Sequence, residues 1–154
     1  MSPSAETDRI ERSVVVKATR ARVWRAISHA EEFGTWFGVN LKGQTFSPGQ
    51  LVRGPITIAG YEHITWEATI EHIEPPNLLS FRWHPYAIDS KDYTKEEPTL
   101  VTFSLADAAA DTTQLTVVES GFDKLPPERR LEAFRMNGRG WTTQMDNIAR
   151  HVAD

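Results

Sequence analysis

The chain has 154 residues, of which 40% are hydrophobic and 25% charged, a balance typical of one globular domain rather than of a disordered chain. It has no cysteine, which excludes disulfides, thiolate catalysis and cysteine-rich zinc sites. The net charge of −4 gives no general attraction to nucleic acid, and no apolar run is long enough to span a membrane. The first residues are polar and lack the apolar core of a secretory signal, so we expect a cytoplasmic protein.

The first part of the chain predicts one strand and two short helices. Residues 10–17 are rich in β-branched side chains, as strands are. Thr19 can cap the helix that follows, and a second short helix is expected over residues 30–37. Residues 1–9 are expected to form a flexible tail, and residues 10–154 a single domain.

The middle of the chain changes to alternation of apolar and polar residues, which indicates an antiparallel sheet with one wet face. The expected strands cover residues 39–43, 51–58, 61–73, 79–83, 101–105 and 115–119. One long irregular connection, residues 84–98, is either a charged surface loop or a lid over a binding site.

The last third predicts one long helix with a continuous seam. Its seam residues recur at spacings of three and four: Leu131, Phe134, Gly138, Trp141, Met145, Ile148 and Val152. A glycine inside a helix costs about 1 kcal/mol relative to alanine, and one that faces inward lets a strand or a ligand approach the backbone. The basic residues of this helix indicate a solvated face or an interaction patch: Arg129, Arg130, Arg135 and Arg139.

The order of these elements predicts an α+β fold in which a curved antiparallel sheet of six to seven strands packs on the long C-terminal helix. This order resembles the START-like (SRPBCC) superfamily, in particular the branch similar to the C-terminal domain of the Hsp90 ATPase activator (AHSA1-like). The resemblance covers residues 10–152 and rests on Pro75-Pro76 before an aromatic strand, on Glu119-Ser120-Gly121-Phe122, and on Gly140-Trp141. It implies the helix-grip (Bet v1-like) fold, with a cavity between sheet and helix, rather than one activity.

Projection of the inward positions gathers aromatic side chains between sheet and helix. These rings either form a solid core or line a cavity for a small, largely apolar ligand. The residues expected to line such a cavity are Trp36, Phe37, Trp66, Trp83, Phe103, Glu119, Phe134, Gly138 and Trp141. Gly138, which this projection places opposite Trp66 and Trp83, is the main indication that space was left there.

Glu119 is the unusual member of this set, because alternation places it on the inner face of the last strand. A buried carboxylate needs a partner or a raised pKa, and the candidate partners are Arg135, Arg139 and His63. Glu119 is then a polar anchor for a ligand or an acid/base. The alternative is that it lies in water at the edge of the sheet.

The sequence is compatible with three functions. The first is binding of a small hydrophobic molecule. The resemblance also implies an interaction domain for an Hsp90-type chaperone, or an enzyme similar to polyketide cyclases and aromatases. For an enzyme, the acids and bases would come from Glu119, Tyr61, His63 and Tyr86.

No metal, nucleophile or phosphate-loop motif is present, so we predict no cofactor, no metal and no catalytic residue. We expect neither a nucleic-acid partner nor a membrane span, and two chains could pair as a homodimer.

Overall fold

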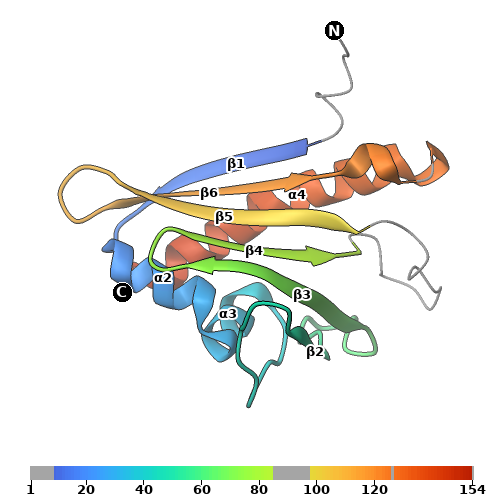
Figure 1. Ribbon diagram of the computed structural model, residues 1–154, viewed down its shortest axis with the longest axis horizontal. Helices are drawn as coiled ribbons and strands as arrows, with labels where there is room; N and C mark the ends of the chain where they lie inside the picture. Colours follow the sequence, from blue (N-terminus) through green and yellow to red (C-terminus); the bar gives the residue numbers. More distant parts are fainter. Residues whose placement is uncertain (1–8, 85–97, 126, 154) are drawn as a thin grey trace, which may run out of the picture.

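The computed structural model describes residues 9–84, 98–125 and 127–153. One six-stranded antiparallel sheet curves against a long C-terminal helix, and two short helices lie near the C-terminal end of that helix (Figure 1). The strands are β1 (Arg9–Val16), β2 (Leu51–Pro55), β3 (Thr65–Glu74), β4 (Leu78–Trp83), β5 (Thr99–Asp107) and β6 (Thr113–Ser120). The helices are α2 (Arg20–Ser28), α3 (Ala30–Phe37), the short 3-10 turn η1 (Phe122–Lys124) and α4 (Pro127–Val152).

The strand order in the sheet is β1-β6-β5-β4-β3-β2, which leaves β1 and β2 at the edges. This architecture is the predicted helix-grip α+β fold, with six strands. The expected tail lies outside the described residues except for Arg9, which begins β1. The expected loop between His84 and Pro98 also lies outside them, so its role as a lid stays a prediction.

The predicted strand over residues 39–43 is wrong, because this segment forms only an isolated bridge between Val39 and Ile56. The side-chain oxygen of Asn40 accepts a hydrogen bond from the backbone of Lys42 at 3.1 Å, and this local bond turns the chain. The predicted start of β3 is also too early. Tyr61 and its neighbours form tight turns, and β3 begins at Thr65.

The first short helix begins where the sequence predicts, and the second has the predicted bounds, Ala30–Phe37. Thr19 caps α2, since its hydroxyl accepts a hydrogen bond from the backbone of Arg22 at 3.3 Å. Gly38 ends α3 with a φ of 102°, a conformation that glycine adopts without strain.

The core lies between the inner face of the sheet and α4. Side chains alternate cleanly along β5 and β6, and the inner ones, such as Phe103 and Val117, are fully buried. The predicted seam of α4 holds from Trp141 to Val152, but Leu131 is 48% exposed and Ala133 is buried instead. A seam spaced strictly by three and four residues drifts by about 20° per heptad around a straight helix, so the first turns of α4 present different positions to the sheet.

Candidate functional site

The inner end of β6 carries a carboxyl group that is completely enclosed. Glu119 is 0% exposed and accepts hydrogen bonds from four side chains on three other elements. One oxygen, Oε2, accepts from Trp83 Nε1 at 2.7 Å and Thr99 Oγ1 at 2.6 Å. The other, Oε1, accepts from Trp141 Nε1 at 2.8 Å and Asn137 Nδ2 at 2.9 Å. We call Glu119 and these four donors the Glu119 cluster.

The Glu119 cluster ties strands β4, β5 and β6 to α4 through one acidic group. Burial raises the pKa of Glu119, and the hydrogen bonds from its four partners oppose that shift. An ionised carboxyl has about four lone-pair positions, so the surrounding donors occupy most of its capacity. Glu119 therefore orients its neighbours and has little capacity left to act directly as a base.

The inward orientation predicted for Glu119 is confirmed, whereas its predicted partners are wrong. Arg135 and Arg139 are exposed on another face of α4, and His63 is exposed in the turn before β3. The alternative in which Glu119 lies in water is also wrong, because the residue is 0% exposed and Asn137 and Trp141 of α4 pack against its carboxyl.

Most of the predicted cavity residues gather in one aromatic cluster. Ring centroids lie 5.8 Å apart for Trp83 and Trp141, 6.0 Å for Phe37 and Trp141, and 6.0 Å for Phe37 and Trp83. Trp66 lies 6.1 Å from Trp83, and Phe103 lies 5.7 Å from Trp141. Much of the space between sheet and helix is thus filled by rings in contact, as in a packed core.

The buried tryptophans Trp36 and Trp66 differ in whether their indole N–H has a hydrogen-bond acceptor. Trp36 donates its indole N–H to the backbone oxygen of Ala26 at 2.8 Å. Trp66 is 7% exposed, and its indole N–H makes no hydrogen bond to any residue that the structure describes. Trp36 is therefore anchored to α2 by a hydrogen bond, whereas the indole of Trp66 makes ring contacts but no hydrogen bond with the described residues.

An open pocket of about 170 Å³ lies where the aromatic cluster reaches the surface, and we call it the aromatic pocket. Its lining residues are Phe37, Trp83, Asn137, Gly140, Trp141 and Gln144. A cavity of about 150 Å³ lined by apolar side chains can hold benzene, so this pocket has room for roughly one ring. A Cβ added at Gly140 would meet no atom within 4 Å, which means that this glycine leaves open space on the helix.

Phe134 and Gly138 do not belong to the aromatic pocket. Phe134 packs against Phe122 of η1, with ring centroids 5.5 Å apart. The backbone oxygen of Gly138 accepts a hydrogen bond from Arg12 of β1 at 3.3 Å, and an added Cβ would lie 3.2 Å from the same guanidinium. The projection of Gly138 toward Trp66 and Trp83 is therefore wrong, because α4 turns this residue toward β1.

Sequence reasoning missed four residues of the site: Thr99, Asn137, Gly140 and Gln144. Asn137 precedes Trp141 by one helical turn, and this spacing is a signal that could have placed it beside the tryptophan. Thr99 opens β5, and nothing in the local pattern marks it.

The described residues considered for acid–base chemistry do not come together with Glu119. Tyr61 is 52% exposed in the turn before β3, His63 is exposed nearby, and Tyr86 lies outside the described residues. Within residues 9–84, 98–125 and 127–153, no three side chains of His, Asp or Glu gather as a metal site would require. In the same part of the chain, no helix is long and apolar enough to cross a membrane.

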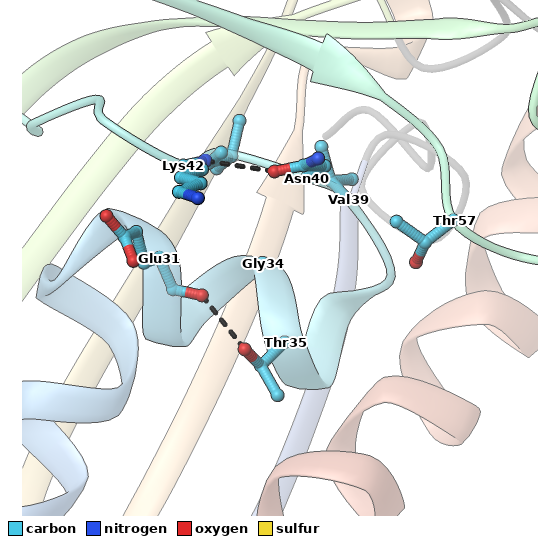
Figure 2. A pocket seen from close by; sticks show the side chains of 8 residues that line it. Glu31, Gly34, Thr35, Val39, Asn40, Lys42 and Thr57 are labelled. Atoms are coloured by element: carbon cyan, nitrogen blue, oxygen red, sulfur yellow. Dashed lines mark hydrogen bonds between the residues drawn. The ribbon is translucent and has the colours of Figure 1, made fainter.

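A second open pocket, of about 280 Å³, lies between α3 and the chain that follows it (Figure 2). Its polar groups bond to one another: Thr35 donates to the backbone oxygen of Glu31 at 3.0 Å, and Asn40 accepts from Lys42 as described above (Figure 2). A Cβ at Gly34 would lie only 2.1 Å from the backbone oxygen of Val39, so this glycine permits the close approach of helix and chain. We interpret this pocket as a structural junction.

Comparison with solved structures agrees with the fold. DynU16, described as a protein from the dynemicin biosynthetic locus, is similar at a TM-score of 0.70 and 23% identity, over 94% of this chain and 47% of that one. This chain thus spans about half of the length of DynU16. Protein MLL2253 from Mesorhizobium loti is similar at a TM-score of 0.69 and 18% identity, over 92% and 94% of the two chains. CalU16 from Micromonospora echinospora has a TM-score of 0.63 and 19% identity, over 94% and 76%.

Comparison at the level of sequence gives the family. No curated protein matches the sequence. The profile of the family described as Activator of Hsp90 ATPase homolog 1-like protein matches residues 17–153, from the residue after β1 through α4. The match includes both short helices, the aromatic strands and the whole Glu119 cluster. The chain therefore belongs to the family of Activator of Hsp90 ATPase homolog 1-like proteins.

Proposed function

We propose that this protein binds a small, largely apolar ligand that carries an aromatic ring, in the aromatic pocket between β4, α3 and α4. The observation that carries this proposal is a pocket lined by three aromatic side chains, Phe37, Trp83 and Trp141, with open space beside Gly140 on the helix. Ligand sites are typically apolar, with a few fixed polar groups that set orientation.

The Glu119 cluster supports this proposal by holding two of the walls rigid. Trp83 and Trp141 both donate their indole N–H to the same carboxyl, so neither ring can turn without losing a buried hydrogen bond. Fixed walls reduce the entropy lost when a ligand binds. Asn137 donates its amide N–H to Glu119, and its side-chain oxygen bonds to no described residue. We therefore expect the ligand to carry a hydrogen-bond donor, as phenols do.

The test fills the pocket from its open side. Gly140→Leu places an isobutyl group in the aromatic pocket, and leucine favours a helix over glycine by somewhat less than about 1 kcal/mol. Phenol and indole serve as ring-sized probes, and the indole N–H signals of the five tryptophans report binding by NMR. In the wild-type protein we expect the signals of Trp83 and Trp141 to shift on titration, while that of Trp24 stays in place.

Two variants serve as controls. Gly140→Ala adds only a methyl group and should keep binding, and Thr143→Leu places the same isobutyl side chain at an exposed position outside the pocket lining. We expect Gly140→Leu alone to abolish the shifts of Trp83 and Trp141, with no loss of stability. Equal probe binding by Gly140→Leu and the wild type would contradict the proposal.

Family membership favours a second candidate, a protein-interaction role with an Hsp90-type chaperone. Its test is the ATPase rate of Hsp90 with added protein, which should rise if this role is correct. Native mass spectrometry of freshly purified protein would complement both tests, since it reports co-purified small molecules and the pairing of two chains.

A further inference from the structure

A larger groove, of about 520 Å³, runs between the edge strand β1 and the middle of α4, on another face of α4 from the aromatic pocket. Four arginines line it, Arg9 and Arg12 from β1 and Arg135 and Arg139 from α4. Among the described residues, the one acidic residue in its lining is Glu11, which pairs with Arg9 at 2.8 Å. We call this feature the arginine groove; it is strongly positive on a chain whose net charge is −4.

Arg12 is held in place across the floor of this groove by neutral groups. Its Nε donates to Thr142 Oγ1 at 3.1 Å, its Nη2 to the backbone oxygen of Gly138 at 3.3 Å, and its Nη1 to the backbone oxygen of Glu11 at 3.0 Å. A guanidinium has five N–H donors, so Arg12 is positioned while part of its hydrogen-bonding capacity stays open. None of these acceptors neutralises its charge.

Arg135 and Arg139 add two charges that have no partner in the part of the chain that the structure describes. They lie four residues apart on α4, where like charges face one another and destabilise a helix. Neither forms an ion pair or hydrogen bond with a described residue. An inward-pointing charge on an edge strand opposes edge-to-edge aggregation, and this role explains why an arginine stands at position 12. The same role does not explain Arg135 and Arg139, because they lie on a helix.

We propose that the arginine groove binds a small soluble organic anion that carries two or more carboxylate or phosphate groups. Guanidinium groups bind both kinds of oxyanion through paired N–H donors. The volume of the groove lies within the usual range of about 300–1,000 Å³ for small-molecule sites. The ring of Phe134, half-buried beside Arg135, provides an apolar surface for the carbon part of the ligand.

Pyrophosphate and citrate are suitable probes, since one presents phosphate oxygens and the other carboxylates. Titration calorimetry of the full chain at constant ionic strength should show one site for at least one of them. The double variant Arg135→Gln/Arg139→Gln should weaken binding by about tenfold or more, because two charge-assisted contacts are lost. Its melting temperature should stay equal or rise, since the repulsion along α4 is relieved.

The matched control is Arg53→Gln/Arg150→Gln, which also removes two positive charges, but at exposed positions outside the groove. We expect it to change affinity by less than about twofold, as surface charges at a distance are screened. Three results would overturn the proposal: no binding of either probe, equal loss in both double variants, or binding only to anionic phospholipid vesicles or to an acidic peptide.

Discussion

Replacing Glu119 with alanine removes the acceptor shared by Trp83, Thr99, Asn137 and Trp141. The hydroxyl of Thr99 can rotate toward another acceptor, but the other three groups are fixed N–H donors. A buried donor without a partner costs about 1–3 kcal/mol. The three donors together therefore cost at most about 9 kcal/mol, and less where the half-buried Trp83 and Asn137 can reach water. The substitution also removes a carboxyl group whose burial is unfavourable, and this gain offsets part of the cost. We expect a net loss of about 3 kcal/mol or more, a large share of the roughly 5–15 kcal/mol that stabilises a typical domain.

The companion variant Glu119→Gln separates charge from hydrogen bonding. Because burial raises the pKa of Glu119, the folded protein holds this proton more tightly than the unfolded chain does. The free energy of unfolding therefore receives a contribution that is present below the unfolded pKa of about 4.3 and is lost as pH rises through the folded pKa. Glutamine does not titrate, so the variant should lack this decline.

Urea unfolding followed by tryptophan fluorescence, repeated between pH 4 and 8, measures both effects. The wild type and Glu119→Gln should differ in the slope of stability against pH, and Glu119→Ala should show the large loss at neutral pH. Parallel pH profiles for the wild type and Glu119→Gln would refute the argument from burial. A loss below about 1 kcal/mol in Glu119→Ala would refute the Glu119 cluster as a support of the fold.

Two further predictions test other parts of the structure. Gly34→Ala should cost about 3 kcal/mol, the upper end of the usual range for overpacking, because its methyl group would meet a backbone oxygen at 2.1 Å. The same change at Gly140, where the added methyl meets nothing, should stabilise α4 by up to about 1 kcal/mol, and thermal unfolding compares the two. Burial raises the pKa of Glu32, but its hydrogen bonds and ion pairs with Arg22 and His151 outweigh that and lower it below its usual value. Stability from this group is present above about pH 4.3 and is lost as pH falls further, so acid unfolding should depend less on pH in Glu32→Gln.

The aromatic part of the candidate site could be predicted because alternation on a strand and periodicity on a helix state which side of an element a residue occupies. Trp66, Trp83 and Phe103 lie at inward strand positions, and Trp141 lies on the helix seam; all four came together. The inward orientation of Glu119 followed from the same alternation.

The partners of Glu119 could not be predicted in this way, because they depend on how α4 is rotated about its axis. Adjacent residues on a helix point about 100° apart, so Asn137 meets Glu119 whereas Gly138 meets Arg12. An error of one residue in that rotation therefore exchanges Asn137, which lines the aromatic pocket, for Gly138, which lines the arginine groove.

By itself, the sequence determined the order of the helices and of the six strands and, for most of them, which face is apolar; residues 39–43 and the first turns of α4 are the exceptions. Those properties depend on local spacing and on the transfer of apolar side chains out of water. Tertiary structure alone decided that aromatic rings fill much of the space between the sheet and α4, that an open pocket forms beside Gly140, and that arginines from β1 and α4 share one groove. These features arise from contacts between residues far apart in the chain, whose distances depend on how the sheet curves and how α4 lies across it.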